Sequence, residues 1–118
     1  MEIKKAKDLI KGDELAVVVF TKGIHFTYDT LGNGETGNWV VDKEVLEDVD
    51  KVIIYLRDED KGTNRIFQGN YSGVRKSPEE NRHTIRFSRL TEVGTTSSNW
   101  NEFADSGQNP VSYVGDFF

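Results

Sequence analysis

The sequence lacks several features on which common protein classes depend. It contains no cysteine and only two histidines and two prolines among its 118 residues. Without cysteine, disulfide bonds, thiolate metal sites and cysteine nucleophiles are excluded, and a reducing, cytoplasmic location is expected. The chain also contains no GxSxG or GxxxxGK[ST] motif, so the usual signatures of serine hydrolases and P-loop enzymes are missing. Gly32, Gly34 and Gly37 have the GxGxxG spacing, but no predicted helix directly follows them, so they are only a weak phosphate-binding signal.

Long apolar segments are missing as well. The N-terminal segment MEIKKAKDLIKGDE has no continuous apolar core of about 7 to 15 residues, which a signal peptide would require. No stretch approaches the roughly 18 apolar residues that cross a bilayer as a helix. We therefore expect no membrane partner, and the length predicts a single domain over residues 1–118.

The apolar residues that are present gather in short runs such as LAVVVF and KVIIYL. These runs, and stretches that alternate apolar with polar residues, predict strands over 15–20, 24–28, 50–57, 64–74, 83–93 and 111–114. We expect 15–20 and 24–28 to form a hairpin, and 50–57 to form a second one with 64–74. Gly69 and Gly73 indicate a bulge or bend, as is common where a sheet curls.

Short helices are expected over residues 5–10, 43–49 and 99–105. Asp42 and Ser98 are the expected N-caps of the second and third helices. Two polar segments, DTLGNGETGN at 29–38 and GTTSS at 94–98, are predicted to be loops because they concentrate turn residues. The fold class is therefore mainly β with short helices (α+β), as a small curled antiparallel or mixed sheet or a pseudo-barrel.

Charge is distributed unevenly along the chain. The net charge is −5, which disfavours indiscriminate binding to nucleic-acid phosphates. One segment is nevertheless basic, and Arg57 on a neighbouring predicted hairpin adds to it. The basic residues of that segment are Arg75, Lys76, Arg82, Arg86 and Arg89. Two interpretations stay open: these side chains contact nucleic-acid phosphates, or they form an ordinary solvated strand face.

The two tryptophans both follow an asparagine in a polar context, as Asn38-Trp39 and Asn99-Trp100. A flat aromatic ring beside an amide is what a pocket for a flat, hydrogen-bonding heterocycle requires. The alternative is that the rings close the open ends of a small barrel. For Trp100, on its predicted helix, the interpretation as a ring that closes the barrel is favoured. For Trp39 neither interpretation is favoured over the other.

Catalytic and metal-binding patterns are weak. His25 and His83 lie on different predicted strands, and neither has a second ligand at a spacing typical of metal sites. The acidic groups at 47–50 and 58–60 are most simply solvated charge at a helix end and in a turn. We therefore expect no catalytic residue, metal ligand or cofactor.

A family resemblance is carried chiefly by residues 50–74, DKVIIYLRDEDKGTNRIFQGNYSGV. Here an apolar strand ends in Arg57, an acidic turn follows, and the return strand is rich in glycine and aromatic residues. With the order of the other elements, this segment resembles the central hairpin of the PUA-like superfamily of small pseudo-barrels, and within it the EVE-like group. In outline the resemblance covers about two thirds of the chain.

The resemblance implies a non-catalytic module that binds DNA or RNA. PUA-like domains bind RNA, and EVE-like domains are thought to receive a flipped, modified base in an aromatic-lined pocket. Some serve as specificity modules of modification-dependent restriction systems. The pocket residues implied here are Trp39 and Asn38, with Tyr28, Trp100 and Asn99 as further wall residues.

Two other functions stay open. The first is a protein-interaction domain, such as a phage or mobile-element accessory factor that binds a larger protein machine. Small size and an acidic net charge suit that function. The second is a small enzyme that acts on a nucleotide or sugar, although no pair of residues in the sequence recommends it.

Overall fold

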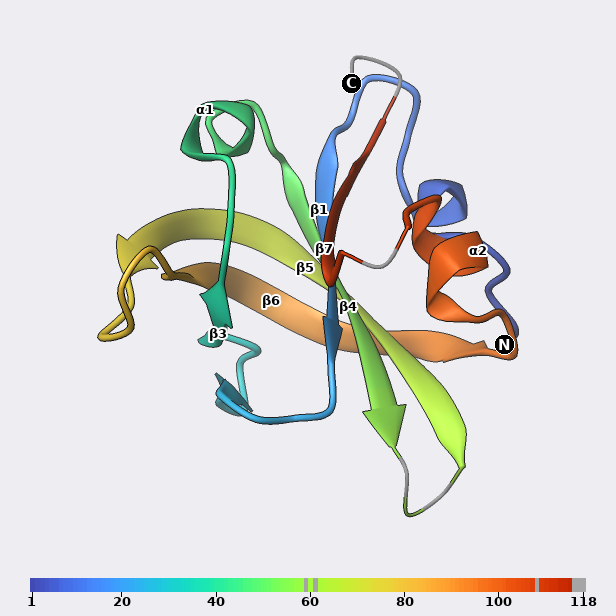
Figure 1. Ribbon diagram of the computed structural model, residues 1–118. Helices are drawn as coiled ribbons and strands as arrows, with labels where there is room; N and C mark the ends of the chain where they lie inside the picture. Colours follow the sequence, from blue (N-terminus) through green and yellow to red (C-terminus); the bar gives the residue numbers. More distant parts are fainter. Residues whose placement is uncertain (59, 61, 108, 116–118) are drawn as a thin grey trace.

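The computed structural model describes residues 1–58, 60, 62–107 and 109–115 and shows a mainly β fold with short helices (Figure 1). The strands are β1 (Ala16–Thr21), β2 (Phe26–Tyr28), β3 (Gly34–Trp39), β4 (Lys51–Asp58), β5 (Thr63–Lys76), β6 (His83–Thr96) and β7 (Val111–Val114). The helices are the 3-10 helix η1 (Ala6–Leu9), α1 (Lys43–Leu46) and α2 (Trp100–Ala104). The strands form a seven-stranded mixed sheet in the order β2-β3-β6-β5-β4-β1-β7. This confirms the predicted fold class at the level of a mixed sheet with short helices.

The centre of the sheet is formed by strands distant in sequence. β1 lies parallel to β4, with Val18 opposite Ile53, and antiparallel to β7, with Val18 opposite Ser112. The predicted hairpin of 15–20 with 24–28 is therefore wrong, because both edges of β1 are taken by β4 and β7. β2 pairs with β3 instead. The continuous apolar run of β1 fits this position, since a strand buried on both faces has no polar side to show.

The predicted hairpin over 50–74 is confirmed as β4 and β5. β5 and β6 are each 14 residues long and visibly curved (Figure 1). Their pairing shifts register between Gln68 and Asn70 and between Tyr71 and Gly73, which confirms the irregularity that the glycines indicated. The curled sheet stays open, because within the described residues its edge strands β2 and β7 do not pair.

Residues 29–38 differ most from expectation, because their second half is strand β3 rather than loop. Asp29 closes the turn before it by accepting hydrogen bonds at Oδ1 from the backbone N–H of Leu31 (2.9 Å) and Asn33 (3.0 Å). Glycine in β3 permits close packing of strands: a Cβ on Gly37 would lie 2.6 Å from Oγ1 of Thr84 on β6. Gly34 and Gly37 are therefore close-approach positions in a strand, whereas Gly32 lies in the turn before it with a positive φ of 82°.

The helix caps confirm one prediction and correct another. Asp42 caps α1, its Oδ1 accepting from the N–H of Glu44 (3.0 Å) and Val45 (3.3 Å). The cap of α2 is Asn99 rather than Ser98, and its Oδ1 accepts from the N–H of Glu102 at 3.0 Å. β6 extends to Thr96, so most of the predicted 94–98 loop is strand.

Hydrophobic residues form a core on each face of the sheet. The first lies inside the curl, beside α1, and includes Val17, Leu46, Ile54, Phe67, Ile85 and Phe87. The second lies beneath η1 and α2 and includes Ala6, Val18, Ile53, Tyr55, Ile66 and Phe103. Along β6, Ile85 and Phe87 face the first core, so Arg86 between them extends from the outer face, where it is exposed. Within the described residues, no helix is long and apolar enough to span a bilayer.

Candidate ligand-binding site

Trp39 ends β3 and lines a hollow of about 400 Å³, named here the Trp39 hollow. The hollow lies between β3 and the segments that carry Phe20, Ile24 and Pro110. Trp39 is half-buried against the first core, and its indole N–H donates to Oγ1 of Thr36 at 3.1 Å. The indole nitrogen is therefore satisfied within the protein, which leaves the ring surface as the part of Trp39 that can contact a ligand.

Asn38 lines the same hollow at a break in the ladder between β3 and β6. The pairing shifts register between Thr36 and Trp39, and such a bulge redirects the side chains within it. Asn38 Oδ1 lies 3.4 Å from Thr84 Oγ1, and Arg82 Nη1 donates to the Asn38 carbonyl oxygen at 3.3 Å. Within the described residues the side-chain nitrogen of Asn38 has no hydrogen-bond partner, so it can donate to a ligand.

A second hollow, of about 250 Å³, adjoins the first and is named the Arg75 hollow. His25, Gly37 and Asn38 line both. Across the Arg75 hollow, Arg75 donates from Nη2 to Glu35 Oε1 (2.7 Å) and from Nε to Glu35 Oε2 (3.2 Å). These two hydrogen bonds hold the pKa of Glu35 below its usual value, against a smaller opposing effect of burial.

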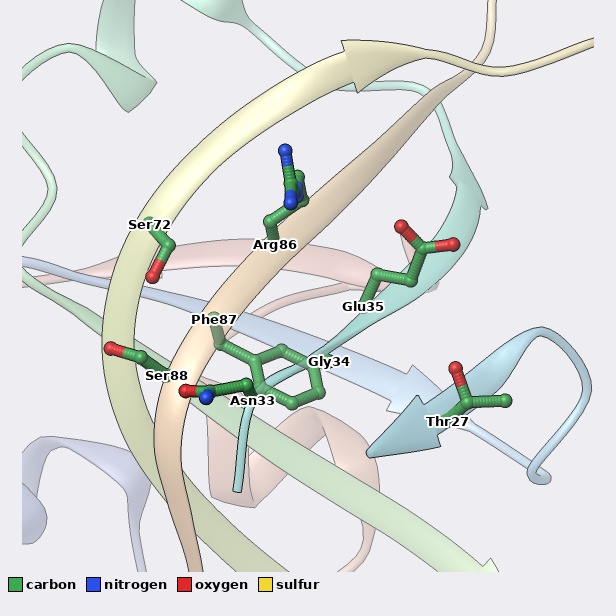
Figure 2. Close-up of a pocket in the computed structure, with 8 residues that line it drawn as sticks. All are labelled: Thr27, Asn33, Gly34, Glu35, Ser72, Arg86, Phe87 and Ser88. Carbon is green, nitrogen blue, oxygen red and sulfur yellow. The ribbon is translucent and has the colours of Figure 1, made fainter. Parts of the chain in front are cut away.

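A third hollow, of about 500 Å³, lies on the outer face of β2, β3, β5 and β6 and is named the Arg86 hollow. It shares Thr27 and Glu35 with the Arg75 hollow. Figure 2 shows Arg86 and Glu35 extending from neighbouring strands, with Ser72 on the adjacent β5. The three hollows therefore follow one another around the β2–β3 hairpin, with aromatic lining at one end and basic and polar lining at the other.

The structure brings together some of the basic residues predicted to contact phosphates. Arg75 and Arg86 line the hollows, and Arg82 contacts Asn38 as described. Arg57 lines a separate hollow at the far end of β4, where Nη1 donates to Asn64 Oδ1 at 2.9 Å. Two others, Lys76 and Arg89, are exposed and line none of the three hollows around the β2–β3 hairpin.

Three residues predicted as pocket walls lie elsewhere. Trp100 packs in the second core, 5.6 Å from the Tyr55 ring centroid, and its indole N–H donates to the Asn109 carbonyl oxygen at 2.8 Å. Asn99 caps α2, as described above. Tyr28 is 47% exposed and packs its ring against Phe26 and Phe67 at the margin of the first core.

Sequence reasoning missed two residues of the site. Phe20 lines the Trp39 hollow and also contacts the Trp100 ring at a centroid distance of 5.8 Å, although the sequence placed it only in a buried strand. Glu35 lies inside the segment predicted as a loop. No local sequence signal marks Glu35, because its cross-strand neighbour Arg86 is known only once β3 is seen to pair with β6.

The chemistry available to this site is stacking, hydrogen bonding and charge. Among the described residues, no three His, Asp or Glu side chains gather as a metal site would require. His83 lies opposite Trp39 in the β3–β6 ladder, and its buried Nδ1 has no hydrogen-bond partner within the described residues.

Comparisons with known proteins provide no relative: no family model, curated protein or solved structure matches the chain.

Proposed function

We propose that this domain is a non-catalytic binding module that receives an unpaired base of a nucleic acid in the Trp39 hollow. The observation that carries the proposal is the pairing of a half-buried tryptophan ring with the unpartnered amide nitrogen of Asn38 in one hollow. A ring can stack on a base, and an amide can donate to the hydrogen-bonding edge of that base.

The surroundings of the hollow support this proposal. Phe20 and Pro110 supply further apolar lining, and a volume of about 400 Å³ is in the range of small-molecule sites. Arg82 and Arg75 lie beside Asn38, where cationic groups attract a nucleic-acid backbone. This arrangement agrees with the function implied by the resemblance to PUA-like and EVE-like domains, which we retain as part of the proposal.

The test is a binding titration with single- and double-stranded DNA and RNA oligonucleotides, with and without modified bases, by fluorescence anisotropy. We expect Trp39→Ala to weaken binding by about 5- to 150-fold, since stacking of a base on an aromatic ring contributes ~1–3 kcal/mol. Trp39→Phe keeps a ring and should retain part of the affinity.

Trp100→Phe is the matched control, because Trp100 lies outside the hollow but is also a partly buried tryptophan that follows an asparagine. Circular dichroism must show that all variants are folded. Equal affinity of Trp39→Ala and the wild-type protein would remove the proposed base pocket.

A protein ligand is the second candidate, favoured by the apolar rim of the hollow. Ile24 lines the Trp39 hollow and is 71% exposed, so an apolar side chain at the rim of the hollow is open to a partner. If no oligonucleotide binds the folded protein, a protein partner at this rim becomes the better explanation. Ile24→Ser would then reduce complex formation with that partner.

A further inference from the structure

Arg86 faces Glu35 across the β3–β6 ladder but, unlike Arg75 and Arg82, it makes no hydrogen bond or ion pair within the described residues. Arg75 is held by Glu35 and Arg82 by the carbonyl oxygen of Asn38, with Glu79 Oε2 3.9 Å from Arg82 Nε. The five N–H donors of the Arg86 guanidinium group are therefore available to a ligand, and a guanidinium binds phosphate oxygens with matching geometry.

Neutral hydrogen-bonding groups also line the Arg86 hollow. They come from three strands and one turn and are the side chains of Thr27, Asn33, Ser72 and Ser88 (Figure 2). None of these four side chains has a hydrogen-bond partner in the part of the chain that the structure describes. Hydroxyl and amide groups beside an arginine are the usual contacts to phosphate oxygens in nucleic-acid complexes.

Glu35 is the carboxylate of this hollow, and its position relative to the two arginines matters. Both of its oxygens accept hydrogen bonds from Arg75, so one arginine offsets its charge. Arg86 then leaves the group of three side chains with one net positive charge. Because Arg75 lines the adjoining Arg75 hollow, this net positive charge is shared by the two hollows and favours an anion where they meet, although the protein as a whole is acidic.

We infer that the Arg86 hollow binds a phosphate oxyanion. The identification of that group as a backbone phosphate of the strand whose base enters the Trp39 hollow rests on the proposed function. The distance along β3 from Glu35, in the Arg86 hollow, to Trp39 is at most about 13 Å, because a strand extends by ~3.3 Å per residue. At ~3.4 Å per nucleotide in a stacked strand, this distance corresponds to roughly four nucleotides. The preferred ligand is accordingly a short single strand rather than a free nucleoside.

The test compares Arg86→Gln with Arg89→Gln. Arg89 is exposed on the same strand and does not line the hollow, so its substitution removes the same charge without removing the proposed contact. Binding of a fluorescent single-stranded oligonucleotide is measured over about 50 to 200 mM salt. We expect Arg86→Gln to weaken binding about tenfold or more and to lower the slope of log K against log salt by about 0.7, the value for one lost phosphate contact.

Arg89→Gln is expected to leave that slope unchanged. If Arg86→Gln and Arg89→Gln give the same affinity and the same slope of log K against log salt, the Arg86 phosphate site is overturned. Loss of binding in Trp39→Ala would still support the base pocket in that case.

A second measurement separates this inference from the proposed function. Inorganic phosphate and an abasic oligonucleotide are titrated against the protein, and the backbone amide signals of Ser72 and Ser88 are followed by NMR. Saturable shifts that disappear in Arg86→Gln support the oxyanion site even if no base binds. An absence of shifts with both probes overturns it, and shifts with phosphate alone assign the site to a free oxyanion rather than a backbone.

Discussion

The Asn38-Trp39 and Asn99-Trp100 pairs are identical in sequence and differ in what the structure does with them. At Asn99 the side-chain oxygen caps α2, and the indole N–H of Trp100 is satisfied by a backbone carbonyl. At Asn38 the amide nitrogen has no partner within the described residues, and Trp39 lines a hollow. Of the two pairs, only Asn38-Trp39 leaves hydrogen-bonding capacity facing a space large enough for a ligand.

The backbone explains this difference. Asn99 has extended dihedral angles directly before a helix, where an amide oxygen is drawn to the free N–H groups of the first turn. Asn38 lies in a bulge between two strands, where ladder hydrogen bonds are interrupted and no free helical N–H groups are near. A residue pair therefore does not define a site until the element that carries it is known.

The largest expected effect that separates the two pairs is on stability. Trp100→Ala removes ring contacts with Phe20 and Tyr55 and a hydrogen bond to Asn109, so we expect the free energy of unfolding to fall by about 3 kcal/mol. Urea denaturation measures this change. Oligonucleotide affinity per folded molecule should stay close to the wild-type value. A tenfold loss of that affinity in the folded variant would contradict the separation drawn between the two tryptophans.

An intermediate effect is expected from the two asparagines. Asn99→Ala removes an N-cap and should lower the free energy of unfolding by about 1 kcal/mol, with no effect on ligand affinity. Asn38→Ala removes one long hydrogen bond of 3.4 Å and should change stability less, while ligand affinity falls severalfold. Urea denaturation gives the free energy of unfolding of each variant, and anisotropy titrations give its affinity for an oligonucleotide. The comparison fails if the two variants lose affinity equally.

The smallest effect concerns pH and the ion pair between Glu35 and Arg75. Because the pKa of Glu35 is lowered in the folded protein, the pair stabilises the fold above the ordinary glutamate pKa of ~4.3. This contribution to stability is lost as the pH falls through the lowered pKa of Glu35 in the folded protein. Both side chains are substantially exposed, so the effect is small. In urea denaturation, Glu35→Gln should be slightly less stable than the wild-type protein at pH 7, and the difference should shrink as the pH is lowered below the ordinary glutamate pKa. A difference that does not shrink in acid would contradict this assignment.

Local signals in the sequence predicted the parts of the fold that depend on neighbouring residues. The β4–β5 hairpin has an apolar run on one arm and a polar turn before the other, and Asp42 has the chemistry of an N-cap. Both are formed by residues close together in the chain. Such elements are accessible to pattern reasoning because their hydrogen-bond partners lie within the same window of sequence.

Elements whose partners are distant were not predicted correctly. Nothing within 15–20 shows that β1 pairs with Lys51–Asp58 on one side and with Val111–Val114 on the other. β3 was missed because its glycines also suit a loop, and only the approach of Thr84 shows why Gly37 is needed in a strand. Asn38 and Trp39, which line the Trp39 hollow, were named as candidate residues from the sequence, whereas the positions of Phe20 and Glu35 required the tertiary structure.

The position of β1 has a consequence for how the chain folds. Both partners of this strand follow it in the sequence, β7 after nearly all the rest of the described residues. Contacts between residues so far apart demand loop closure before they give any stabilisation, so we expect this domain to fold more slowly than one built from local contacts. Until β7 is made, one side of β1 offers free backbone groups to other chains, so the nascent protein is expected to depend on protection from association during synthesis.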